Sequence, residues 1–219
     1  MDIDLKFEWK LDRDGYDTTR ESVRDMYGRP YERENILARG GPELGYRPLE
    51  IDGLWLQFAD TCRSREGVRQ FVRKFGPLQD SPNVVHYYQG VAEKLWAIWQ
   101  FLEAGDRRAA MELFNDERND SYPHPMMRMS IGESAERPGG FAPVLVPDRL
   151  EDALRLQALQ AITENKQFRR CRNDGCVNWF GYGPSAPHRQ TYTKRREFCS
   201  DRCRIAWGRR NKREALSHA

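Results

Sequence analysis

Two short stretches near the C-terminus decide the fold of the last quarter of this chain of 219 residues. They read Cys171-Arg172-Asn173-Asp174-Gly175-Cys176 and Cys199-Ser200-Asp201-Arg202-Cys203. Two close pairs of cysteines, here with 22 residues between them, are typical of a tetrahedral zinc site, because each pair supplies two thiolates and the intervening chain folds back. We therefore expect one Zn²⁺ bound by Cys171, Cys176, Cys199 and Cys203. Four protein ligands leave no position for substrate, so the predicted site is structural.

The residues that flank the cysteines predict a knuckle, a β-hairpin and a helix, in that order. Asn173, Asp174 and Gly175 favour a tight turn around the metal. Residues 177–182 and 194–198 are expected to form two hairpin strands. Ser200 is a suitable N-cap for a helix that carries Cys203 in its first turn. This order is that of a treble clef, and the sequence predicts a four-cysteine treble-clef zinc finger over residues 168–219. The residues expected in its small core are Trp179, Phe180, Phe198, Ile205 and Trp207.

The charge of the chain is concentrated in the same region. The whole chain has a net charge of +3, but residues 166–219 hold 14 Lys and Arg against four Asp and Glu. That balance of +10 leaves −7 for the rest of the chain. A basic segment of this kind favours a polyanion as partner, although many charge runs are only a solvated surface. The residues that we expect to contact nucleic acid are Arg172, Lys194, Arg195, Arg196, Arg202, Arg209, Arg210, Lys212 and Arg213.

Residues 1–114 are predicted to form a mostly helical N-terminal body with short strands. The clearest helix follows Ser81-Pro82, since apolar residues recur there at spacings of three and four up to Leu102. A helix over residues 64–75 ends at Gly76-Pro77, and another, capped by Asp106, runs to Phe114. Alternation predicts a strand over residues 5–11. Residues 13–50, rich in Arg, Gly and Pro, are expected to be irregular.

A polar segment joins the body to the predicted finger. Residues 115–140 are expected to be a loop or linker, and residues 141–167 a strand and a helix that lead into the finger. Asp148 and Glu151 match a capping box at the start of that helix. The expected fold class is thus mainly α with short strands, an α+β body followed by the four-cysteine finger.

Residues 147–213 resemble the CGNR-type zinc fingers and their relatives in bacterial proteins. The resemblance rests on the helix that leads into the first cysteine pair, on Trp179-Phe180, on residues 198–204 and on the basic tail. It implies a finger that follows a mostly helical domain, in proteins regarded as transcriptional regulators. The Cys-Gly-Asn-Arg sequence that names the group is replaced here by Cys203-Arg204-Ile205-Ala206, so no role of that Asn-Arg pair is carried over.

These features predict a nucleic-acid-binding protein, directed at DNA and regulatory, whose body senses a ligand, dimerises or binds a protein partner. If the body has a pocket, we expect Trp55, Trp96 and Trp99 to line it. The alternative is a protein-interaction or scaffold module with a purely structural zinc. The chain has four His, with no pair near the finger, and no Gly-rich phosphate loop, Gly-x-Ser-x-Gly elbow or His-Glu-x-x-His helix, which argues against an enzyme.

The chain is expected to be soluble and cytoplasmic. No apolar run approaches the roughly 18 residues that a membrane span needs, and the N-terminus does not resemble a signal peptide. In a reducing compartment, clustered cysteines are better interpreted as metal ligands than as disulfides.

Overall fold

A computed structural model of the chain describes residues 2–3, 7–24, 27–79, 83–116, 127–133, 141–182 and 197–217. Within these ranges the fold is α+β, with six α-helices and short, mostly antiparallel strands. In this part of the chain, no helix has both the length and the apolar character that a membrane span requires.

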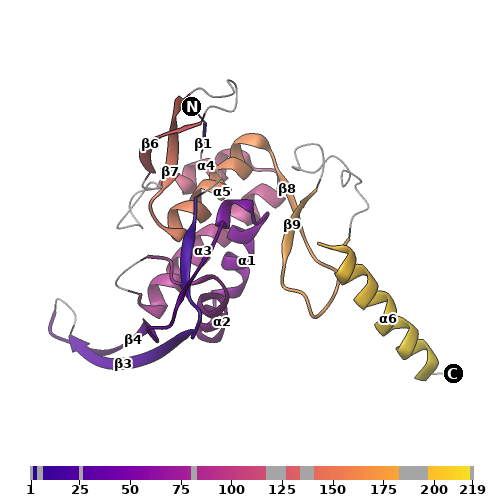
Figure 1. Cartoon of the computed structure of the whole chain (residues 1–219), viewed down its shortest axis with the longest axis horizontal. Helices are drawn as coiled ribbons and strands as arrows, with labels where there is room; N and C mark the ends of the chain where they lie inside the picture. The colour runs from indigo at the N-terminus through magenta and orange to yellow at the C-terminus, as the bar shows by residue number, and fades with distance from the viewer. Residues whose placement is uncertain are drawn as a thin grey trace.

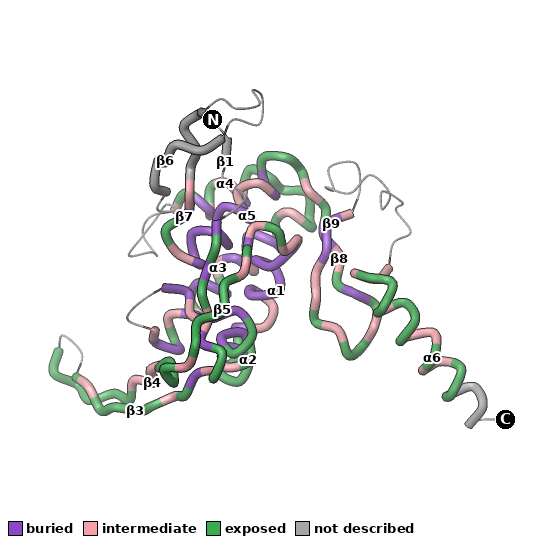
Figure 2. Tube along the Cα trace, viewed as in Figure 1, coloured by how far each residue is buried: buried purple, intermediate pink, exposed green. Residues whose placement is uncertain are grey.

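The core of the body is built around its longest helix, α3 (Val85–Glu103). This helix packs against α1 (Leu54–Thr61), α2 (Arg65–Phe75), α4 (Arg107–Phe114) and α5 (Leu150–Glu164). Figure 1 shows these helices grouped together, and Figure 2 shows the buried residues concentrated along them. Fully buried side chains include Trp55, Phe58, Tyr88, Ile98 and Leu154, and burying each contributes about 1.5–3 kcal/mol. Helix α5, which leads toward the cysteines as expected, is itself part of this core.

Several helix ends lie where the sequence predicts them. The Ser64 side chain caps α2 by accepting from the Gly67 amide, and α2 ends at Gly76, whose φ of 81° suits only glycine without strain. Asp106 caps α4 through the amide of Ala109. The prediction of a capping box at the start of α5 is wrong. Arg149 is the N-cap residue, and its side chain makes no capping hydrogen bond. Glu151 is instead buried and pairs with Arg155, because this first turn lies inside the core.

The strands form four small sheets. The first has the order β1-β7-β6, and the other three pair β2 with β5, β3 with β4, and β8 with β9. Their bounds are β1 Asp2–Ile3, β2 Trp9–Asp12, β3 Tyr16–Arg24, β4 Pro30–Ala38, β5 Glu43–Tyr46, β6 Met127–Glu133, β7 Phe141–Pro147, β8 Gln167–Arg170 and β9 Trp179–Tyr182. A short 3-10 helix, η1 (Pro48–Glu50), precedes α1. Strand β7 confirms the strand predicted from residue 141.

Two predictions for irregular chain are wrong. Residues 13–50 contain β3, β4 and β5, and the nine-residue strands β3 and β4 form a hairpin that extends away from the helices (Figure 1). Within strands β3 and β4, only Tyr16, Glu34 and Ile36 are buried, so the sequence lacks the alternation that marks a strand. Residues 115–140 contain β6, which pairs with β7; residues 117–126 and 134–140 lie outside the described part. The strand predicted at 5–11 is shorter, Trp9–Asp12, with Leu5 outside the described residues.

Candidate metal centre

The first cysteine pair lies in the turn between β8 and β9. Arg170 pairs with Trp179 in the antiparallel ladder, and the next residue, Cys171, donates its amide to the carbonyl of Asn178 at 3.0 Å. The amide of Cys176 then donates to the carbonyl of Asn173 at 2.7 Å, which closes a tight turn. The predicted knuckle is therefore the tip of a hairpin, and the turn residues Asn173, Asp174 and Gly175 form it as expected.

The second pair lies at the start of helix α6 (Asp201–Ser217). The Ser200 hydroxyl accepts from the amide of Cys203 at 3.3 Å, as predicted for an N-cap, and this places Cys203 in the first turn. Cys199 directly precedes the cap, and its Sγ lies 3.5 Å from that of Cys203.

The four sulfur atoms form one cluster. All four Sγ atoms lie within 4.8 Å of one another, and those of Cys176 and Cys199 are 3.6 Å apart. Zinc–sulfur bonds of about 2.3 Å in a tetrahedral site place sulfur atoms about 3.8 Å apart, close to these separations. The cysteines predicted as ligands are thus brought together and positioned to hold one metal ion. Cys171 is buried and the other three are half-buried.

The surroundings of Cys176, Cys199 and Cys203 shift the pKa values of these three thiols. Burial raises the pKa of Cys176 to about 12, and burial together with a hydrogen bond to Cys203 raises the pKa of Cys199. Burial also opposes ionisation of Cys203, but hydrogen bonds with Ser200, Cys199 and Cys176 outweigh it and lower its pKa to about 7. A bound cation would favour ionisation of all of these thiols.

The hairpin that carries the knuckle is anchored in the body. Phe168 of β8 is buried and meets Trp55 and Trp99 edge-on, with ring centroids 5.9 and 6.5 Å apart. Trp179 of β9 meets Trp99 at 5.3 Å and Trp96 at 6.1 Å. These contacts fix the hairpin against helices α1 and α3. Trp55, Trp96 and Trp99, predicted to line a pocket, instead lie in the core and at this joint.

Polar groups of α1 and the residues before it complete the joint. Asp60 accepts from the Trp179 indole at 3.3 Å and lies 3.6 Å from Arg170, and Asp52 accepts from the amide of Gly181 at 2.6 Å. Gly53 is required here, because a Cβ would lie 2.9 Å from the Trp179 carbonyl oxygen. The sequence contains no signal for Asp52 or Asp60, since a carboxylate before or within a helix is ordinary.

The predicted nucleic-acid contacts divide into three groups. Arg172 pairs with Glu197 at 2.6 Å and lies over the Trp207 ring, and Arg210 binds Asn173 at 2.7 Å, so both hold the knuckle to α6. The second group is exposed on α6: Arg202, Arg209, Lys212 and Arg213. The third group, Lys194, Arg195 and Arg196, lies outside the described residues, as does most of the second predicted hairpin strand. In the described part of the chain, β9 pairs with β8.

The remaining predicted core of the finger is only partly buried. Phe198 and Trp207 meet with ring centroids 5.5 Å apart, and Phe180 is buried on β9, but Ile205 is exposed.

Comparison of the chain with protein-family models, with curated proteins and with solved structures finds no match.

Proposed function

We propose that this chain is a zinc-dependent nucleic-acid-binding protein that acts on DNA as a transcriptional regulator. The metal would be zinc, because four clustered thiolates with tetrahedral spacing are the ligand set typical of structural zinc sites. A knuckle in a hairpin turn, followed by a helix with the last ligand in its first turn, supports the treble-clef interpretation. The same elements support the resemblance to CGNR-type fingers.

The observation that carries the proposal is the division of α6 into two faces. One face holds Cys203, Trp207 and Arg210, which contact the knuckle or the other cysteines. The rest of the helix surface holds the solvent-accessible cations Arg202, Arg209, Lys212 and Arg213, and beside them the helix's Asp201 is paired with Arg204 at 3.1 Å. One face of α6 is thus fixed to the metal module, and the other presents cations to the solvent.

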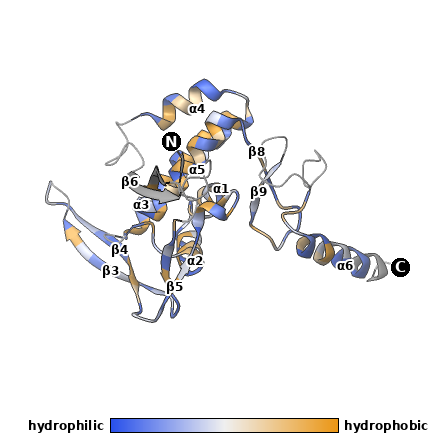
Figure 3. Cartoon of the chain, turned by 45° about the horizontal axis from the view of Figure 1, so that its top comes forward, coloured by the Kyte–Doolittle hydropathy of each residue, from blue (hydrophilic) through white to orange (hydrophobic). Residues whose placement is uncertain are grey.

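The position of α6 suits a nucleic-acid duplex. The helix points away from the body (Figure 1), and hydrophilic residues alternate along it with a few hydrophobic ones (Figure 3). Seventeen helical residues span about 26 Å. The major groove of B-form DNA admits an α-helix, whereas that of A-form RNA is too narrow, which favours DNA. Arginine and lysine at the helix edges would then reach phosphate oxygens.

The test is DNA binding by the metal-loaded chain at about 50 and 200 mM salt. Zinc content is measured on the same sample, where we expect one zinc per chain, lost in Cys176→Ser. We expect salt-sensitive binding to duplex DNA that Arg209→Ala/Arg213→Ala weakens about tenfold or more, since charge-assisted hydrogen bonds contribute about 1.5–3 kcal/mol each. The loss of two phosphate contacts should also make the plot of log binding constant against log salt concentration less steep, by about 1.8.

Arg204→Ala is the matched control, because Arg204 lies on the same helix but pairs with Asp201. It should bind as the unchanged chain does. Failure of the zinc-loaded chain to bind duplex DNA at low salt would contradict the proposal, and the exposed face of α6 would then be a docking surface for an acidic protein.

A further inference from the structure

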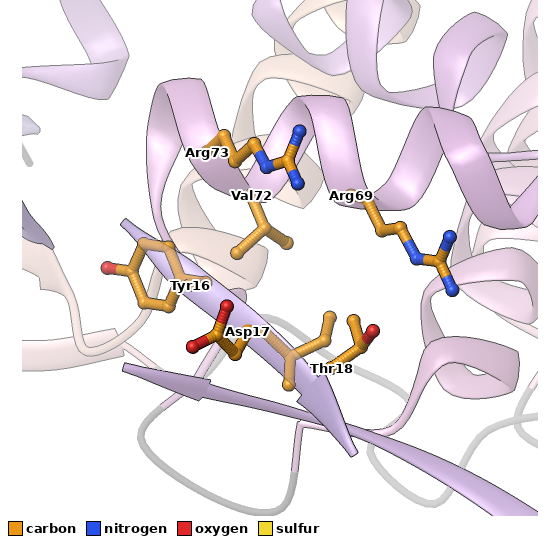
Figure 4. Close-up of a pocket in the computed structure, with 7 residues that line it drawn as sticks. Tyr16, Asp17, Thr18, Arg69, Val72 and Arg73 are labelled. Atoms are coloured by element: carbon orange, nitrogen blue, oxygen red, sulfur yellow. The ribbon is translucent and has the colours of Figure 1, made fainter. Parts of the chain in front are cut away.

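A small cavity in the body lies between the hairpin base and helix α2. Its volume is about 260 Å³, and it is lined by Tyr16, Asp17, Thr18, Ile36, Arg69, Val72 and Arg73. Figure 4 shows Arg69, Val72 and Arg73 on one helix opposite Asp17 and Thr18 on one strand. The cavity is far along the chain from the cysteines, and nothing in the proposed DNA binding uses it.

Two arginines one helical turn apart supply positive charge to this cavity. Arg69 binds Glu34 at 2.6 Å and lies 3.6 Å from Glu66, and its Nε is buried, so its guanidinium is already engaged by these two carboxylates. Arg73 makes no ion pair or hydrogen bond within the described part of the chain. The unpaired guanidinium of Arg73 is a donor set suited to a carboxylate.

The opposite wall supplies one negative charge. The Oδ1 atom of Asp17 binds Arg39 at 2.5 Å, and among the described residues its Oδ2 atom has no partner. The hydrogen bond from Arg39 and the nearby charge of Arg73 lower the pKa of Asp17, so this carboxylate is ionised at neutral pH. Asp17 and Arg73 therefore face the same cavity with opposite charges and without pairing directly.

These charges discriminate between classes of ligand. A simple anion would be repelled by Asp17, and a simple cation by Arg73. A molecule that carries both a positive and a negative group can pair its negative group with Arg73 and its positive group with Asp17. We propose that this cavity binds a free α-amino acid, with its carboxylate on Arg73 and its ammonium group on Asp17.

The size and floor of the cavity restrict the side chain of such a ligand. Val72 and Ile36 are buried apolar residues in the lining. One water takes about 30 Å³ in the liquid, so the cavity has room for roughly nine non-hydrogen atoms. Amino acids with small or medium apolar side chains fit these limits best, because the apolar part would contact the floor.

The experiment is a binding screen on the full, metal-loaded chain. Each of the twenty amino acids is tested by thermal shift and then by titration calorimetry, and for alanine and valine the analogues that lack the amine or the carboxylate are tested beside them. We expect saturable binding of at least one small apolar amino acid and none of its analogues. Arg73→Gln should weaken this binding about tenfold or more, as should Asp17→Asn.

Arg65→Gln is the control, because Arg65 lies two turns from Arg73 on the same helix and does not line the cavity. It should leave the affinity unchanged. The proposal is overturned if no amino acid binds, if analogues without the amine bind as tightly, or if Arg65→Gln and Arg73→Gln have equal effects. DNA binding by α6 is measured separately, so its result is independent of this one.

Discussion

A single carboxylate, Asp12, organises the base of the β3–β4 hairpin. It accepts backbone N–H groups from Asp14 at 2.8 Å, from Gly40 at 2.6 Å and from Gly41 at 3.1 Å. Its burial opposes ionisation, but these hydrogen bonds outweigh that effect and lower its pKa below the ordinary value of 3.8. The side chain thus joins the turn after β2 to the segment between β4 and β5.

Asp12→Asn should destabilise the protein at neutral pH, because the amide is a weaker acceptor for these donors. A carboxylate with a lowered folded-state pKa contributes stability above pH 3.8, and this contribution is lost as the pH falls through the lowered pKa. The difference in urea midpoint between the two proteins should therefore be constant from about pH 5 to 7 and shrink below about pH 3.8. Asp14→Asn, at an exposed neighbour, is the control. An equal difference at every pH would contradict this role of Asp12.

At the scale of elements, the sequence predicts what local chemistry determines. The cysteine pairs, the caps Asp106 and Ser200, and the periodicity of α3 are local signals, and the structure contains the corresponding elements. The β3–β4 hairpin has no such signal, since both of its faces are largely exposed. Strand β8 is expected from the sequence only as a connection, because Phe168 is its one apolar residue and its partner β9 is selected by tertiary packing.

The β8–β9 hairpin should depend on one side chain in particular. Trp179→Ala removes contacts with Trp96 and Trp99 and the hydrogen bond to Asp60. We expect a loss of about 2–4 kcal/mol in the free energy of unfolding, somewhat less than for a fully buried tryptophan, measured by urea denaturation. Val177→Ala, at an exposed position of the same hairpin, should change it by less than about 0.5 kcal/mol. Equal effects of the two substitutions would show that the joint contributes little.

At the scale of the whole molecule, the cysteine cluster and the body share one hairpin. Phe168 lies three residues before Cys171, and Trp179 three residues after Cys176, so both strands connect a cysteine of the cluster to the helical core. Order at the knuckle and order at the joint therefore support each other. The sequence does not reveal this dependence, because it arises from contacts of the hairpin with α1 and α3. Asp60 of α1, for example, lies more than a hundred residues before its partner Trp179 along the chain.

Chelation of the metal should consequently destabilise the body as well as the knuckle. We expect the thermal midpoint of the helical signal to fall by more than about 5 °C, since each kcal/mol shifts it by about 2–4 °C in a protein of this size. Tryptophan fluorescence should change in the same transition, because Trp179 lies at the joint. Resupplied zinc should restore both signals. A helical signal that melts at the same temperature with and without metal would show that the two parts are independent.

The joint also bears on how such a protein can change over evolutionary time. Here a transplanted module would take Phe168 and Trp179 with it, leaving a gap beside Trp55 and Trp99 in the donor and two unmatched aromatic rings in the recipient. We therefore expect the cysteine module and helices α1 and α3 to be inherited together, with substitutions at position 179 accompanied by changes at positions 96 and 99.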